Sequence, residues 1–207
     1  MVCMGKTNQI LEDNKAQMGK KLSEMTLKEL WELFPIFLVE HNKNWKRYFN
    51  EIEKQIKELL SDHRVERISH IGSTAIPNIW AKNIIDVLVE ISESANMKKV
   101  GYVLEQNGFL IMATNTDRIS LNKGYTEEGF ANQVYHIHLR YIGDNDELYF
   151  RDYLSENPQI AKEYEALKLE LWKRYEHNRD AYTDAKTDFI REYTEKARKK
   201  YGDRYSR

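Results

Sequence analysis

The residues best suited to chemistry lie in the stretch SHIGSTAIPNIWAKNIIDVLVEI, residues 69–91. An apolar run ends at Gly72, Ser73 and Thr74 follow, and Asp86 then stands inside a second apolar run. Glycine lets a ligand approach the backbone closely, and serine adds a hydroxyl group. A helix beginning there would aim its free N–H groups at an anion. The pattern predicts a phosphate site formed by Gly72, Ser73 and Thr74.

Asp86 predicts a metal or substrate contact beside that phosphate site. The chain between Ser73 and Asp86 has room for one helical turn and a return into a neighbouring strand. A carboxylate placed there can hold Mg²⁺ against phosphate oxygens. The alternative is a structural acid that is satisfied by the backbone and by Lys82, since buried carboxylates need a partner.

Two histidines suggest a different metal. The segment VYHIHLRYI alternates, so His136, His138 and Arg140 share one face of a predicted strand. The two imidazoles would lie about 7 Å apart along the strand, a spacing that suits chelation of one metal ion together with Asp86. Imidazole ligands favour Zn²⁺, Mn²⁺ or Ni²⁺ over Mg²⁺. Substrate contact and a purely structural role stay open for both histidines.

Three cations, Lys82, Arg140 and Arg151, are the preferred candidates for binding phosphate because they stand among apolar residues. Arginine suits bidentate contacts, whereas lysine acts as a point charge. Arg118, Lys123, Lys168 and Lys186 are further candidates, although isolated charges of this kind more often lie on the surface. The expected ligand is a nucleotide or another phosphorylated small molecule, and the expected cofactor is a divalent metal: Mg²⁺, Mn²⁺ or Zn²⁺.

These residues need strands and helices to position them, and the order of the predicted elements favours an α+β domain with a mixed sheet. The segment 115–133 is rich in turn residues and predicts a loop or a hairpin. Strands are predicted over 65–71, 83–91, 109–114 and 134–142. Helices are predicted over 27–34, 42–60, 95–107 and 147–154, from Pro158 after an Asn157 cap, and from Asp180 or Thr183 onward.

The sequence as a whole resembles the GrpB-like family of the nucleotidyltransferase superfamily over about residues 25–198. The resemblance rests on HIGSTAIPNIWAKNIIDVLVEI, KGYTEEGF, VYHIHLRYIGDNDELYFRDYL, KEYEALKLEL and YTDAKTDFI, in this order. It implies a nucleotidyltransferase-like mixed β-sheet flanked by helices, followed by C-terminal helices. The implied activity moves a nucleoside monophosphate from a nucleoside triphosphate to a small-molecule or protein acceptor.

The sequence departs from the superfamily pattern at the second acid. That acid would stand two residues after Asp86, where this chain has Leu88. Glu90 shares the face, but four residues of strand span about 13 Å, too far for one shared metal. Three hypotheses follow: a nucleotidyltransferase, a non-catalytic nucleotide- or phosphate-binding protein of the same fold, and a transition-metal hydrolase that uses His136 and His138.

Composition limits the possible partners and the cellular location of the protein. The 207 residues carry a formal net charge of -1, which gives no global argument for a nucleic-acid or membrane partner. Cys3 is the single cysteine, and no apolar run approaches a membrane span, so a cytoplasmic location is expected. Residues 1–24 are polar and expected to be poorly ordered. Residues 25–207 form one predicted domain, of which 155–207 is helical, and its oligomeric state stays open.

Overall fold

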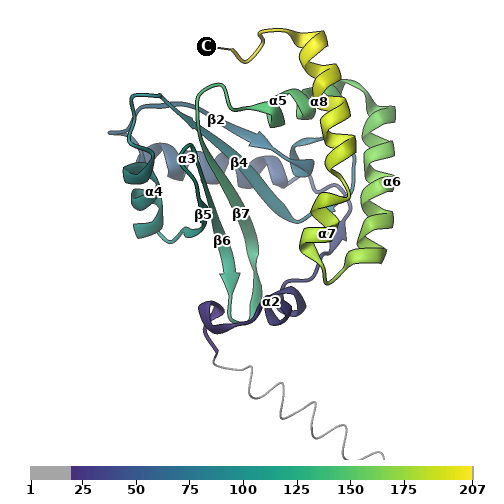
Figure 1. Ribbon diagram of the computed structural model, residues 1–207, viewed down its shortest axis with the longest axis horizontal. Helices are drawn as coiled ribbons and strands as arrows, with labels where there is room; N and C mark the ends of the chain where they lie inside the picture. Colours follow the sequence, from purple (N-terminus) through teal and green to yellow (C-terminus); the bar gives the residue numbers. More distant parts are fainter. Residues whose placement is uncertain (1–19, 207) are drawn as a thin grey trace, which may run out of the picture.

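Five strands form the central sheet of the molecule (Figure 1). The computed structural model describes residues 20–206. The strand order is β2-β4-β7-β6-β5; β4 runs parallel to β7, and the other neighbouring pairs are antiparallel. The α+β class with a mixed sheet is therefore confirmed. The strands are β2 (Val65–Ile71), β4 (Ile84–Ile91), β5 (Leu110–Thr114), β6 (Arg118–Thr126) and β7 (Gly129–Tyr141).

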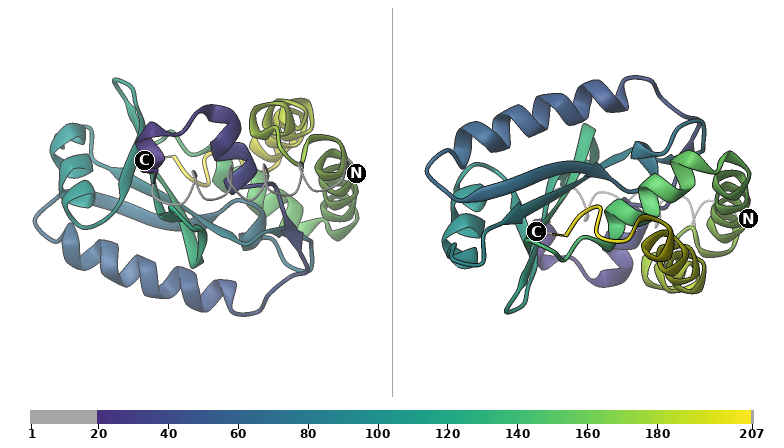
Figure 2. Two further views of the ribbon diagram at one scale, coloured as in Figure 1. Left: turned by 90° about the horizontal axis from the view of Figure 1, so that it is seen from below. Right: turned by 90° about the horizontal axis from the view of Figure 1, so that it is seen from above.

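Helices cover this sheet from two sides. Figure 2 shows α3 on one side of the sheet and α5 and α8 on the other. The two-residue strands β1 (Leu38–Val39) and β3 (Ala81–Lys82) form a separate small ladder that the sequence did not predict. The helices are α2 (Leu27–Leu33), α3 (Trp45–Leu59), α4 (Met97–Gln106), α5 (Asp146–Glu156), α6 (Pro158–Tyr175), α7 (Arg179–Asp184) and α8 (Thr187–Tyr201), with 3₁₀ turns η1 (Leu22–Glu24) and η2 (Ser73–Ala75).

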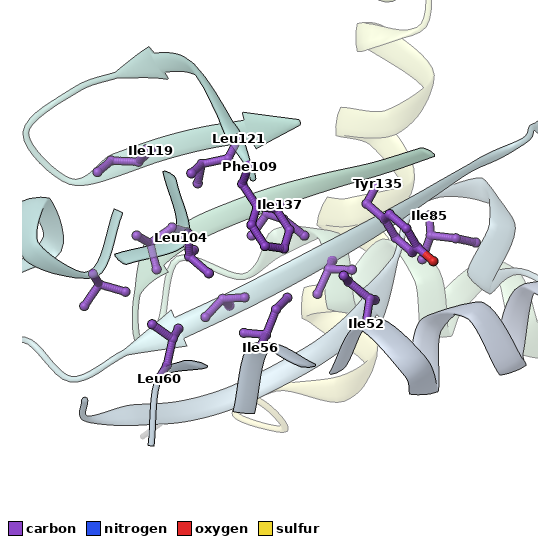
Figure 3. Close-up of a cluster of buried hydrophobic side chains, with 14 of the residues drawn as sticks. Ile52, Ile56, Leu60, Ile85, Leu104, Phe109, Ile119, Leu121, Tyr135 and Ile137 are labelled. Atoms are coloured by element: carbon purple, nitrogen blue, oxygen red, sulfur yellow. The ribbon is translucent and has the colours of Figure 1, made fainter. Parts of the chain in front are cut away.

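The main core lies between the sheet and helices α3 and α4. Helix α3 forms where it was predicted because its apolar residues recur at helical spacing and are buried together. Each fully buried side chain of this size contributes about 1.5–3 kcal/mol through removal from water. Figure 3 shows this cluster, with Ile52, Ile56, Leu60, Ile85, Leu104, Phe109, Ile119, Leu121, Tyr135 and Ile137 labelled.

The register of β4 and β7 decides which side chains can meet on the opposite face. Asp86 is paired with His136, and Leu88 with His138. Val87 alternates with them and is buried in the main core, as is Ile137. Because successive strand residues point to opposite faces, Asp86 and both histidines lie on the face away from α3.

The segment 115–133 forms most of a hairpin, so the hairpin alternative is confirmed. Strand β7 begins at Gly129, five residues before the predicted start at Val134. This extension was not predicted because residues 130–132 are exposed and the two apolar ones, Phe130 and Ala131, are adjacent, so the apolar alternation of a half-buried strand is missing. The register also shifts between Lys123 and Tyr125, around Gly124 with its positive φ of 93°.

The C-terminal part is helical, as predicted, but its last helix is divided into α7 and α8. Pro158 occupies the first turn of α6, while the Asn157 side chain makes no cap hydrogen bond. Residues 1–19 and Arg207 lie outside the described residues, and so does most of the segment expected to be poorly ordered. Among residues 20–206, no helix has the length and apolar character needed to span a bilayer.

Candidate functional site

A cavity of about 680 Å³ lies between the open face of the sheet and helices α5 to α8. This size is within the range of small-molecule sites. The sheet side contributes Ile71, Gly72, Ser73, Thr74, Lys82, Ile84, Asp86, His136 and His138. The helical side contributes Asp146, Glu147, Phe150, Tyr164, Lys168, Tyr182, Thr183, Lys186, Thr187, Ile190, Arg191, Thr194, Glu195 and Arg198.

Gly72 lets the turn after β2 approach the Asp86 carboxylate. Its φ of 69° and ψ of -174° fall in a region that essentially only glycine adopts. A Cβ atom on Gly72 would lie 2.3 Å from Oδ2 of Asp86. The expected helix after Ser73 is only the three-residue turn η2, since Pro77 disfavours helical backbone in the residue before it. The helix dipole invoked for this turn is therefore not available.

Thr74 and His70 serve the fold beside this turn. Thr74 is buried, and its hydroxyl donates a hydrogen bond to the Ile84 carbonyl oxygen. Nε2 of His70 lies 3.0 Å from the Thr74 hydroxyl, and its ring stacks on Phe49. Burial lowers the pKa of His70 to about 4, so the imidazole is neutral near pH 7. Thr74 thus reaches the cavity wall with its hydroxyl already engaged.

Asp86 stands in a chain of hydrogen bonds across the sheet. Its Oδ1 lies 3.4 Å from Nδ1 of His136 and 3.3 Å from Nε2 of His138. The other ring nitrogen of His136 lies 2.8 Å from the hydroxyl of Tyr125. That hydroxyl accepts a hydrogen bond of 2.8 Å from Arg179 of α7. These hydrogen bonds therefore link Arg179 of α7 to the Asp86 carboxylate.

The polarity of these bonds assigns the proton positions. Nδ1 of His136 faces the Asp86 carboxylate, which can only accept, so Nδ1 carries the proton of the neutral imidazole and Nε2 accepts from the Tyr125 hydroxyl. Burial lowers the pKa of His136, which favours this neutral form. Burial alone would raise the pKa of Asp86, but the hydrogen bonds from His136 and His138 outweigh it and lower that pKa. Asp86 is therefore an anion with Oδ1 engaged.

Tyr125→Phe tests this assignment. The change removes the hydroxyl between Arg179 and His136, so we expect the free energy of unfolding to fall by about 1–2 kcal/mol. We also expect His136 to populate both neutral tautomers, which nitrogen NMR of the imidazole ring measures. Tyr102→Phe is the matched control, because Tyr102 is exposed on α4. An unchanged Nδ1–H tautomer in Tyr125→Phe would contradict the assigned polarity.

Three lysines line the cavity together with Asp86. The ammonium groups of Lys82 and Lys186 lie 5.6 Å and 4.3 Å from the centre of the Tyr182 ring, and neither ammonium group makes a hydrogen bond or ion pair within residues 20–206. Lys168 is fully buried and donates a hydrogen bond to the Trp80 carbonyl oxygen. Burial, reinforced by mutual repulsion, lowers the pKa of Lys82 and of Lys168 to about 7. Burial lowers the pKa of Lys186 to about 8.

The predicted cations divide into two groups. Lys82 lines the cavity with Gly72, Ser73, Thr74, Asp86 and both histidines. Arg140 does not line it, because the guanidinium lies 3.4 Å from Asp144 and 3.6 Å from Glu147. Arg151 also lies elsewhere and binds the His70 carbonyl oxygen, Asp152 and the Tyr205 hydroxyl. Both arginines were expected at the phosphate, and the structure commits them to ion pairs instead.

Sequence reasoning gave too little weight to the helical side of the cavity. Lys168 shares a buried stripe of α6 with Ala161, Tyr164 and Leu171. A lysine within such an apolar stripe is unusual, because lysine is almost never fully buried without a partner. This signal could have placed Lys168 among the preferred candidates. Lys186 was among the further candidates, whereas nothing in the local pattern identifies Tyr182.

The donor groups do not fit a two-metal centre. Asp86 is the single carboxylate at the Gly72 turn, and Leu88 occupies the position of the second acid. Glu90 is fully buried and accepts hydrogen bonds from Arg67, Gly143 and Asn145. Within residues 20–206, no three His, Cys, Asp or Glu side chains are grouped to hold a metal. The two imidazoles that were expected as metal ligands instead engage Asp86.

Comparisons with known proteins identify the family to which this chain belongs. The family model described as GrpB protein matches residues 35–196. The chain belongs to the GrpB family. The family member "Glutamate-rich protein GrpB" of Alkalihalophilus pseudofirmus is 35% identical over 171 residues, covering 76% of this chain and 92% of that protein. "UPF0157 protein YqkA" of Bacillus subtilis is 30% identical over 185 residues, covering 86% of this chain and 53% of that protein.

A solved GrpB structure has the same fold. The crystal structure of conserved protein GrpB from Enterococcus faecalis matches with a TM-score of 0.68 at 30% sequence identity. The match covers 80% of this chain and 99% of that one. This chain thus shares the mixed sheet flanked by helices with that GrpB protein, in agreement with the fold that the sequence resemblance implied.

Proposed function

We propose that the cavity binds a nucleotide or a similar phosphorylated small molecule. The observation that carries the proposal is the pair Lys82 and Lys186, which line the cavity and whose ammonium groups make no hydrogen bond or ion pair among the described residues. Burying an unpaired ammonium group is unfavourable unless something compensates for it. An anionic ligand supplies the missing partner.

The charges around the two lysines support an anion of more than one negative charge. Lys168 adds a third ammonium group from α6, and Asp86 is the carboxylate nearest to the Gly72 turn. Ser73 and the flexible backbone of Gly72 offer close approach on the sheet side. A terminal phosphate or pyrophosphate group therefore fits between the sheet and the N-terminal end of α8.

Nucleotidyl transfer is the second candidate. It is favoured by the position of Asp86 Oδ2, which faces Gly72 of the turn while Oδ1 holds both imidazoles. In that reaction an acceptor oxygen or nitrogen would form a bond to the α-phosphorus of a nucleoside triphosphate, and pyrophosphate would leave. Oδ2 would orient the acceptor or the ribose through a hydrogen bond, and the lysines would hold the phosphates.

Calorimetric titrations with ATP, pyrophosphate and adenosine test the binding proposal. We expect ATP and pyrophosphate to bind and adenosine, which lacks phosphate, to bind far more weakly. A parallel assay for pyrophosphate release from ATP distinguishes a transferase from a binding protein, with Asp86→Asn as the variant that should abolish release. A protein that binds none of the three ligands, or binds adenosine as tightly as ATP, would contradict the proposal.

The affinity for pyrophosphate should depend on pH. The pKa values of Lys82 and Lys168 are lowered to about 7 and that of Lys186 to about 8, so these groups lose protons as the pH rises through this window. A bound anion favours the protonated forms, and linkage then weakens binding by up to about tenfold per pH unit for each proton taken up. Titrations between pH 7 and 9 measure this. Constant affinity over that range would show that the lysines do not contact the ligand.

A further inference from the structure

We infer that this cavity neutralises the phosphates of its ligand with lysine side chains, so that ligand binding needs no divalent cation. The inference rests on the proposed function and adds to it the means by which the phosphate charge is compensated. It also separates this chain from the metal-based scheme that the fold implies.

The first step is that the place of the second metal-binding acid is filled by an apolar contact. Leu88 is fully buried and packs with Ile71 and with Leu148 of α5. A carboxylate at this position would be covered by α5 and removed from the cavity. The docking of α5 on the sheet therefore depends on an apolar residue where a metal centre needs an acid.

The second step is that the other acids along this face are unavailable. Glu90 is fully buried, and its oxygens accept hydrogen bonds from Arg67 at 2.5 and 3.1 Å, from Gly143 at 3.1 Å and from Asn145 at 3.0 Å. Asp86 itself has Oδ1 engaged by two imidazoles. One oxygen, Oδ2, remains, so strand β4 offers a divalent ion at most one carboxylate oxygen, and phosphate and water would have to supply the rest of its ligands.

The third step is that the lysines converge from three separate elements. Lys82 comes from β3 and Lys186 from the residue before α8, and both contact the ring of Tyr182. Lys168 comes from α6 and lies over Tyr164. The cavity is also lined by Asp146, Glu147, Glu195, Arg191 and Arg198. The three lysines and Asp86 alone carry an excess of two positive charges when all three lysines are protonated. One divalent ion would supply the same charge.

The test is calorimetric titration of the full chain with ATP and with pyrophosphate, once in a chelator such as EDTA and once with excess Mg²⁺. We expect saturable binding in the chelator, and no gain in affinity when Mg²⁺ is added. Lys186→Met should weaken binding in the chelator at least about tenfold. Lys196→Met, within α8, is the matched control, because Lys196 lies outside the cavity and pairs with Glu192.

The outcomes separate this inference from the proposed function. Binding that appears only with Mg²⁺ would overturn the inference and leave the proposed function standing. An unchanged affinity of Lys186→Met in the chelator would also overturn it, provided that thermal unfolding shows the variant to be folded. No binding in either condition would overturn both. As a second measurement, ATP should raise the melting temperature of the wild type in the chelator.

Discussion

Gly72→Ala is expected to lower the free energy of unfolding by about 3 kcal/mol or more. Part of the loss is backbone strain, since φ of 69° with ψ of -174° costs a residue with a Cβ about 1–3 kcal/mol. The rest comes from overpacking, which typically costs about 1–3 kcal/mol. The new Cβ would lie 2.3 Å from Oδ2 and 2.9 Å from Cγ of Asp86. Chemical denaturation of both proteins measures the difference.

Gly108→Ala provides the control for positive φ alone. Gly108 has φ of 85° after α4, and a Cβ there would meet no atom within 4 Å. We expect this variant to lose about 1 kcal/mol. In an Asp86→Ala background the cost of Gly72→Ala should shrink, because the carboxylate that causes the closest contact is gone. Equal losses for Gly72→Ala and Gly108→Ala would show that the turn does not press against Asp86.

Lys82→Met is expected to have opposite effects on stability and on binding. The change removes a partly buried ammonium group that has no partner, so the ligand-free protein should gain about 0.5–2 kcal/mol in the free energy of unfolding. The same change should weaken pyrophosphate binding by about 10- to 100-fold, the loss expected for one hydrogen bond to a charged group. Methionine keeps most of the volume of the side chain and its contact with Tyr182.

The stability gain of Lys82→Met should depend on pH, in a direction set by the pKa of Lys82. Burial lowers the pKa of Lys82 from its ordinary value of 10.5 to about 7 in the folded protein. The folded form therefore binds fewer protons than the unfolded form between these values, and the stability of the wild type rises with pH through this window. The advantage of Lys82→Met should be largest below pH 7 and shrink toward pH 10. A variant that is less stable than the wild type at pH 6 would contradict the account.

Elements whose pattern is set by the main core were predictable from sequence. Strand β4 is almost continuously apolar, as expected for a central strand covered on both faces, and α3 shows clear helical spacing. The adjacency of Gly72 and Asp86 was predictable too, because a turn after one strand and an acid in the next meet at a shared register. The pairing of Ile71 with Asp86 confirms that geometry.

The other half of the cavity was not predictable, because it depends on how the C-terminal helices return to the sheet. Lys186 approaches Lys82 only because α7 and α8 fold back over the open face, a contact between residues far apart in the chain. Arg140 has the same strand alternation as His136 and His138 and so lies on their face, but its guanidinium pairs with Asp144 and Glu147, which follow the strand. The alternation of apolar and polar residues predicts the strand face on which a side chain lies. Its ion-pair partner depends on tertiary packing.

We propose that lysines on the two sides of the cavity, Lys82 and Lys186, hold the phosphate groups of the ligand. Titration of pyrophosphate in EDTA into the wild type and into the double variant Lys82→Met with Lys186→Met tests it most directly, since pyrophosphate offers phosphate and nothing else. We expect saturable binding by the wild type and an affinity for pyrophosphate that is more than about 100-fold weaker in a folded double variant. Binding of equal strength by both proteins, or none by the wild type, would contradict it.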